Sequence, residues 1–348
     1  MKNENAIDLF KFIFSLLIVA IHVHIFRGNL SEYDSFITNG IARVGVPFFF
    51  ISGSYFLFKN LNATYSVSCL KKYFSKLLRL YTIWSIIYFF PIMLIAVKNG
   101  TSISQLFSDG IQNYLFNGIA THLWYLNTTI ICTLFFILII KQRIRKIVLP
   151  LCIVLFICGL LCNAYNKIIM PIENDYFQSV VDFITKYTYS TNFSVPFFWM
   201  IFIYIGYLFA TDKLKINKRV CLMLLPISFF ALYLELWFVD SNLLFYGHSI
   251  SISILPTSIL IFALSLNLKF NDDNIYIYMR HMSTLIYLIH PLILTIVAIL
   301  FSVIEFDIDI SGLLYVVVAT LSILLSCIII KLHSKNERIP LKLSYLYK

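Results

Sequence analysis

The chain has 348 residues, of which 60% are hydrophobic and 13% are charged, and its formal net charge at pH 7 is +10. Soluble domains carry about 25% charged residues, so this composition, with a mean hydropathy of +0.85, excludes an ordinary cytosolic enzyme. The apolar runs are long and continuous, which favours spanning helices over the short alternating strands of a β-barrel. The sequence therefore predicts an all-α polytopic membrane protein.

Hydropathy predicts ten transmembrane helices along the chain. Their ranges are 8–26, 41–59, 77–97, 122–140, 147–164, 194–210, 220–239, 250–267, 283–303 and 311–331. The second is the weakest because Arg43, Pro47 and Gly53 interrupt it. The sixth, at about 17 residues, is close to the lower length limit for crossing the hydrocarbon.

The distribution of Lys and Arg predicts the orientation. With the N-terminus inside, 22 of the 27 Lys and Arg residues fall in segments that face the cytosol. The five outside are Arg27, Arg43, Lys98, Lys167 and Lys186. Because basic residues concentrate on the cytoplasmic side, both termini are expected to be cytoplasmic. Cations beside anionic lipid account for the net charge, so no nucleic-acid partner is expected.

A single domain over 1–348 is predicted, because no linker-like or low-complexity stretch divides the chain. The two longest outside loops, 98–121 and 165–193, are rich in Asn, Ser, Thr, Tyr and Asp. That composition suits the lining of a site for a polar extracellular ligand. It equally suits solvated connectors.

The first span carries a polar face. Lys11 and His22 lie eleven positions apart, about three helical turns, so both point the same way, with Ser15 and Ile18 between them. His24 faces roughly the opposite side. Such ionisable residues, and the lack of a small-residue cleavage site, argue against a cleavable signal peptide. An imidazole near mid-bilayer is costly unless it is used, and it suits general-base catalysis; the alternative is interhelical packing.

The third span begins with a basic stripe. Lys72, Lys76 and Arg79, spaced four and three apart, share one helix face at the inner end, and Tyr81 and Trp84 follow. Such a stripe can hold the phosphates of a nucleotide-bearing thioester. Anchoring by the positive-inside rule is the alternative.

Two further segments combine polar groups with unusual backbone. His122 directly precedes the interfacial aromatics Trp124 and Tyr125 at the outer entry of span four. In the run 45–53, Pro47 and the glycines are expected to break a regular helix, and irregular backbone at membrane depth requires shielding by protein or a cavity.

The late spans contribute two more candidates. His290 lies well inside span nine, and Pro291 frees a backbone carbonyl nearby. Glu235 is the acid deepest in a predicted span, where it could orient a histidine or form a structural pair. The histidines lack metal-ligand spacing, so no metal is expected.

Taken together, these segments resemble the membrane acyltransferase 3 family. The matching elements, in family order, are the basic-x10-His pair Lys11 and His22, the Phe-rich run 48–53 closing on Ser-Gly, the basic motif 76–80, the His-Leu-Trp element 122–126 and the Ser-to-His-Pro element 283–291. Lys76 occupies a position where the family often has Arg. Lysine keeps the positive charge but lacks the bidentate geometry of the guanidinium.

The resemblance implies a ten-helix, multi-pass enzyme of the bacterial cell membrane. Such O-acyltransferases pass an acyl group, usually acetyl, from cytosolic acyl-CoA to a hydroxyl of an extracytoplasmic glycan. His22 is then the catalytic base, with Lys11 reaching the donor and Glu235 in support. The basic stripe binds CoA phosphates. The expected substrate-binding residues are His122, Trp124, Tyr125 and His290.

The chain also looks similar to the membrane half of vancomycin-resistance serine racemases, notably in 43–50 and 122–125. That similarity leaves open a second function, transport of a small polar solute such as serine. A third is a structural subunit of a polysaccharide export complex. Membrane lipids are expected partners in each case, and the oligomeric state, a homo-oligomer included, stays open.

Overall fold

The computed structural model describes residues 4–25, 35–64, 67–98, 100–141, 145–162, 165, 179, 196–241, 251–303, 311–335 and 343–348. Within these ranges every regular element is helical, which confirms the all-α prediction. The chain divides into two compact units, which are described separately below. Unit 1 comprises 1–52, 215–238 and 251–348, and unit 2 comprises 53–214 and 239–250. The single domain expected from the sequence stays a prediction.

Seven of the described helices are long and apolar enough to cross a membrane. They occupy Asn5–Val23, Phe36–Asn62, Val67–Lys98, Ile103–Ile140, Lys218–Phe238, Asn274–Phe301 and Ser311–His333. Three shorter apolar helices, Lys146–Leu161, Met200–Ala210 and Ile254–Asn267, coincide with the remaining predicted spans. The protein is therefore a multi-pass membrane protein, as the composition predicted.

Unit 1 is built around the first helix. Its elements are α1 (Asn5–Val23), η1 (Ser35–Ile41), η2 (Ala42–Val44), the start of α3 (Gly45–Thr64), α11 (Lys218–Ser241, up to 238), α12 (Ile254–Asn267), α13 (Asn274–Val303), α14 (Ser311–Lys335) and η6 (Leu343–Leu346). α1 packs chiefly against α13 and also contacts α14, α12 and η2, while α13 packs along α14.

α1 and α13 run in the same direction. Asp8, in the first turn of α1, binds Arg280 early in α13. Further along both helices, the rings of His22 and His290 lie 5.1 Å apart between centroids. Two polar contacts separated along both axes therefore fix the register of this parallel pair.

The directions of the other helices of unit 1 can be compared with this pair. Ser311, at the start of α14, donates to the Ile25 carbonyl just past the end of α1, so α14 runs antiparallel to α1. Asn5 donates to the Asn271 carbonyl, which brings the chain after α12 to the start of α1. At this same C-terminal end of α12, Asn267 donates to the carbonyl of Ile216, just before the start of α11, so these two helices are antiparallel.

The segment before α3 is irregular, whereas α3 itself is not. η1 is π-helical and η2 is 3-10 helical, but α3 continues without interruption through Pro47 and Gly53. The expectation of a break within 45–53 is therefore wrong. Pro47 lies in the first turn, where backbone N–H groups have no intrahelical acceptor, so its missing donor costs little.

α3 packs antiparallel on α1 through a close approach. Ala42 contacts the cluster of Ile18 and Ile21. Phe48 lies 5.0 Å from the ring of Phe14. A Cβ at Gly45 would come within 3.2 Å of the Phe14 Cβ, so glycine permits this approach.

Unit 2 holds the remaining helices. They are the end of α3, α4 (Val67–Lys98), α5 (Ile103–Gln112), η3 (Asn113–Asn117), η4 (Thr121–Leu123), α6 (Trp124–Lys141), α7 (Arg145–Cys162), η5 (Pro196–Trp199) and α10 (Met200–Ala210). Aromatic contacts bind α6, α7 and α10 together. α6 and α10 run parallel, since Trp124 lies 5.1 Å from Trp199 and Phe136 lies 5.8 Å from Tyr207.

α7 runs opposite to α10, because Phe156 in its second half stacks at 4.8 Å on Phe198 just before α10. α4 runs opposite to α6. Tyr88 lies against His122 before the start of α6, and Tyr73, fifteen residues earlier, interacts with Thr133 further along α6.

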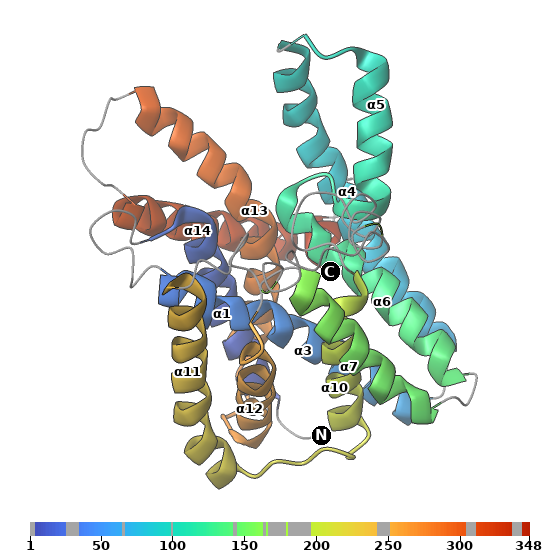
Figure 1. Ribbon diagram of the computed structural model, residues 1–348. Coiled ribbons are helices and arrows are strands. Elements are labelled where there is room, and N and C mark those ends of the chain that lie inside the picture. Colours follow the sequence, from blue (N-terminus) through green and yellow to red (C-terminus); the bar gives the residue numbers. More distant parts are fainter. Residues whose placement is uncertain are drawn as a thin grey trace. The chain divides into compact units, whose positions relative to one another are not determined.

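The predicted outside loop 98–121 is largely helical. After α4 the chain turns and α5 folds back beside it (Figure 1). Tyr114, in η3, lies 4.8 Å from Tyr81, and the chain then returns to the level of Tyr88, whose ring is 4.7 Å from His122. α4, at 32 residues, is about 48 Å long and exceeds the roughly 30 Å hydrocarbon. The other predicted loop, 165–193, lies almost wholly outside the described residues.

Candidate functional site

A polar cluster of unit 1 lies between α1 and α13. His22 is half-buried, and His290 is wholly buried with 0% exposure. Their ring planes are inclined by 43° at a centroid distance of 5.1 Å. The Nδ1 atom of His290 lies 2.9 Å from the carbonyl oxygen of Ile286. Because a carbonyl can only accept, Nδ1 of His290 carries the hydrogen in this contact.

The α1 stripe predicted from the sequence is continuous along one helix. Lys11 and His22 are both half-buried, and Ser15 between them is wholly buried and donates to the Phe12 carbonyl at 2.7 Å. His24, by contrast, is exposed and ends the helix with a left-handed φ of 54°. The two histidines of α1 thus differ in environment as their spacing predicts.

Arg43 joins this cluster and was not among the residues selected from the sequence. It lies in η2, which packs against α1 where Ala42 contacts Ile18 and Ile21, and its Nε atom is buried. The sequence did carry a signal, since Arg43 is a cation inside a predicted span, where ionisable residues tend to be functional. Its proximity to α1 depends on the irregular η1 and η2 backbone.

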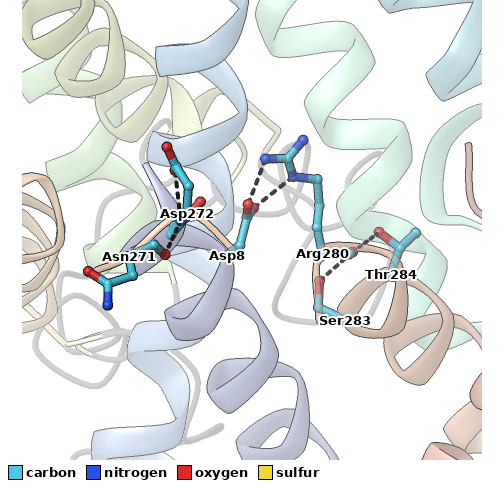
Figure 2. Close-up of polar contacts among 7 residues, drawn as sticks. Asp8, Asn271, Asp272, Arg280, Ser283 and Thr284 are labelled. Atoms are coloured by element: carbon cyan, nitrogen blue, oxygen red, sulfur yellow. Dashed lines mark hydrogen bonds and ion pairs between the residues drawn. The ribbon is translucent and has the colours of Figure 1, made fainter. Parts of the chain in front are cut away.

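An ion pair links α1 and α13 at the end of their contact that is opposite to the two histidines. Figure 2 shows the Arg280 guanidinium directed at the Asp8 carboxylate, with Nε and Nη2 donating at 2.8 and 2.6 Å. Asp8 is 0% exposed, whereas the Arg280 side chain is 48% exposed. The Arg280 carbonyl accepts hydrogen bonds from Ser283 and Thr284 (Figure 2). The bidentate fork compensates the desolvated carboxylate.

Glu235 has a structural contact of its own in unit 1. Its two carboxylate oxygens accept from the backbone N–H groups of Ile252 and Ser253, at 2.5 and 2.8 Å. These groups lie at the N-terminus of α12, where helices leave unsatisfied donors and favour negative charge. This geometry favours the structural alternative for Glu235 over the catalytic one.

The predicted donor residues lie together on α4 of unit 2. Lys72 and Lys76 are exposed, and Arg79 is half-buried with its Nε atom buried. Their spacing on one continuous helix gives the single basic stripe expected from the sequence.

The predicted substrate residues of unit 2 gather around η4 and the start of α6. His122 is 2% exposed and packs edge-on against Tyr88. Trp124 packs against Trp199, and Tyr125 follows on α6. His290, predicted to act with them, belongs to unit 1 beside His22. In the part of the chain that the structure describes, no group of three or more His, Cys, Asp or Glu could hold a metal ion.

Comparison with known proteins places these features in one family. The model of an acyltransferase domain matches residues 4–332 and so covers nearly the whole chain. No solved structure matches. The α1 stripe, the basic stripe, η4 and the His290 segment all fall inside the matched range.

Three curated relatives come from enterococci. An amino-acid racemase of Enterococcus faecalis is 28% identical over 306 residues, which are 85% of this chain and 42% of that protein. A second one from the same species is 33% identical over 59% of this chain and 29% of the relative. A serine/alanine racemase of Enterococcus gallinarum is 29% identical over 57% and 28%. The chain thus matches less than half the length of each of these relatives. Because the family model matches residues 4–332, the chain belongs to the membrane acyltransferase 3 family.

Proposed function

We propose that the protein is a membrane O-acyltransferase. It moves an acyl group, usually acetyl, from cytosolic acyl-CoA to a hydroxyl of an extracytoplasmic glycan or another cell-envelope molecule. The observation that carries this proposal is the His22–Arg43–His290 cluster on helices of the acyltransferase domain. It combines a base and a fixed cation in a membrane segment.

The reaction at this cluster is acyl transfer with proton transfer by His22. His22 takes the proton of the acceptor hydroxyl while that oxygen attacks the thioester carbonyl carbon. The carbon–sulfur bond then breaks, and the proton passes from His22 to the departing CoA thiolate. Arg43 stabilises the negative charge that develops on the carbonyl oxygen.

The donor is held at the cytosolic side. Arg79 and the two lysines of the α4 stripe contact the CoA phosphates, since guanidinium forks and ammonium groups both suit phosphate. Lys11, on the His22 stripe, reaches the donor from α1. His122, Trp124 and Tyr125 bind the acceptor, because aromatic faces and a hydrogen-bonding imidazole suit a sugar. The partners are then the glycan acceptor and membrane lipids, without nucleic acid.

The helix directions support ten crossings with both termini in the cytosol. In unit 1, α1, α3, α11, α12, α13 and α14 alternate in direction in chain order. Because α11 and α13 run in the same direction, the short α12 between them must cross the membrane in the opposite direction. In unit 2, α4, α6, α7 and α10 also alternate in direction along the chain. Because these helices are even in number, α11, which follows them, runs opposite to α3, which precedes them. Within the residues that the structure describes, the two sets together give ten helices.

The test is acyl-CoA turnover by the purified protein in proteoliposomes. His22→Ala should lower acyl transfer by at least about 1,000-fold, within the range for general-base catalysis. The matched control is His24→Asn, which changes the neighbouring exposed histidine and tolerates its left-handed backbone. It should retain wild-type activity. Acyl transfer by the His22 variant at the wild-type rate would refute the proposed base.

The names of the relatives favour a second candidate, transport of a small polar solute such as serine. Radiolabelled serine uptake into the same proteoliposomes, without release of free CoA, would support the transporter and overturn acyl transfer. Release of CoA that depends on an added acceptor, with no serine uptake, supports the enzyme. A purely structural subunit predicts neither signal.

A further inference from the structure

We infer that α5 binds the outer surface of the lipid bilayer, with one sector of the helix among lipid acyl chains and the opposite sector toward headgroups and water. The sequence left two interpretations for residues 98–121, the lining of a polar site and solvated connectors. A membrane-bound hairpin differs from both. The inference concerns unit 2 and does not depend on acyl transfer.

The first step concerns the attachment of α5 to α4. α5 lies alongside the second half of α4 (Figure 1). The ring of Phe107 is 6.1 Å from that of Phe89, and a Cβ at Gly110 would come within 2.8 Å of the Phe89 ring. Further on, in η3, the Tyr114 hydroxyl lies 2.7 Å from the Thr82 hydroxyl of α4. The two helices therefore form a packed antiparallel hairpin.

The second step concerns the faces that α5 exposes. Ile103, Phe107 and Ile111 follow one another at spacings of four, so they share a sector of about 80°. Each of these side chains is more than half exposed. The opposite sector is polar and also exposed, and it consists of Ser104, Gln105, Ser108, Asp109 and Gln112. An apolar sector opposed to a polar one is typical of a helix that lies in a membrane interface.

The third step concerns the surface of α4 beside this sector. Ile86, Phe90 and Leu94 form a similar row at spacings of four, and each is more than half exposed. On both helices the row is rotated in the positive sense from the contact residues, Phe89 on α4 and Gly110 on α5. For antiparallel right-handed helices, such rotations lead to the same side of the hairpin. The apolar sector of α5 thus continues the exposed apolar surface of a spanning helix.

The fourth step concerns depth. Just before α6, His122 lies 4.7 Å from Tyr88, which marks the level on α4 where α6 begins. α6 has 18 residues and is about 27 Å long, nearly the thickness of the hydrocarbon. α4 continues in the outward direction to Lys98, about 15 Å beyond Tyr88. In the proposed orientation, the hairpin therefore extends past the span of α6 to the outer interface.

Lipid fits the hairpin at this level for a physical reason. A hairpin that stood upright in water would expose the apolar rows of both helices, which is unfavourable. A hairpin fully inside the hydrocarbon would bring Asp109 and its polar neighbours into lipid, which is also costly. If the hairpin lies obliquely on the bilayer, the apolar rows contact acyl chains and the polar sector stays in water.

Tryptophan substitutions test the inference. Phe107→Trp places an indole in the apolar sector, and Gln105→Trp, the control, places one about 160° away on the same helix. Each variant is reconstituted in phosphatidylcholine vesicles with and without bromine on the acyl chains, and the wild-type emission of the four native tryptophans is subtracted. The Phe107→Trp signal should fall at least about twofold in brominated vesicles, and the Gln105→Trp signal less than about 1.2-fold.

Equal quenching of the two signals, or no quenching of either, overturns the inference. Ile111→Trp is a second probe of the apolar sector and should behave as Phe107→Trp does, so the test does not depend on the contact with Phe89. Thermal unfolding in detergent checks that each variant is folded. Quenching of Phe107→Trp only in vesicles that hold single copies would show that a second copy covers the sector, and would also overturn the assignment to lipid.

Discussion

The two units of the molecule distribute their polar groups differently. In unit 1 the ionisable residues are buried or half-buried and paired across helices: Asp8 with Arg280, and His22 with His290 beside Arg43. In unit 2 the lysines of the α4 stripe are exposed, and the buried polar side chains near η4 pack against aromatic rings. Buried ionisable groups require partners, whereas exposed cations need none. Under the proposed function, substitutions in the buried pairs of unit 1 are expected to change kcat, and substitutions in the α4 stripe of unit 2 are expected to change KM.

Arg43 gives the strongest test of this contrast. Arg43→Gln removes the cation beside His22, and we expect kcat to fall about 100-fold because one donor to a developing oxyanion is lost. KM for acyl-CoA should stay within about twofold. Arg43→Lys should recover part of the lost kcat, because lysine keeps the positive charge but lacks the bidentate guanidinium geometry. A change confined to KM would assign Arg43 to substrate binding, in conflict with the contrast.

The α4 stripe should show the opposite pattern. Arg79→Gln is expected to raise KM for acyl-CoA about 10-fold, since a charge-assisted phosphate contact contributes roughly 1.5–3 kcal/mol. kcat should change little. The control is an acyl-pantetheine donor without phosphates, for which the variant and the wild type should have the same KM. Equal effects on both donors would count against phosphate binding by Arg79.

The Asp8–Arg280 pair should affect stability more than chemistry. Asp8→Asn leaves Arg280 without its counter-ion and loosens α1 from α13, so we expect thermal inactivation several degrees lower. kcat should fall by less than 10-fold. Asn5→Ala, which removes an exposed contact to the Asn271 carbonyl, is the control and should be close to neutral. A wild-type inactivation temperature for Asp8→Asn would show that the pair does not hold the helices together.

Glu235 should have the smallest effect on activity. Glu235→Ala removes both acceptors of the backbone donors at the start of α12, and we expect a loss of about 1–3 kcal/mol in stability. kcat of the folded fraction should match the wild type. Glu235→Gln retains one acceptor oxygen and should lose less. A selective collapse of kcat in both variants would restore the catalytic role that the sequence suggested.

Local patterns along the chain determined much of this protein. Apolar runs predicted the helices, because a backbone in lipid must satisfy its own hydrogen bonds. The spacing of Lys11 and His22 predicted their shared stripe, and the same rule placed Lys72, Lys76 and Arg79 together on α4. These predictions depend on one helix at a time, so its period of 3.6 residues was enough.

Only the tertiary structure decided which helices meet. The parallel contact of α1 with α13 brings His290 to His22 across 268 positions, and Arg280 to Asp8 across 272. The π- and 3-10-helical turns of η1 and η2 bring Arg43 to α1, and the N-terminus of α12 engages Glu235. Such contacts depend on how side chains from distant segments pack and compensate one another's charge. No single-helix pattern contains that information.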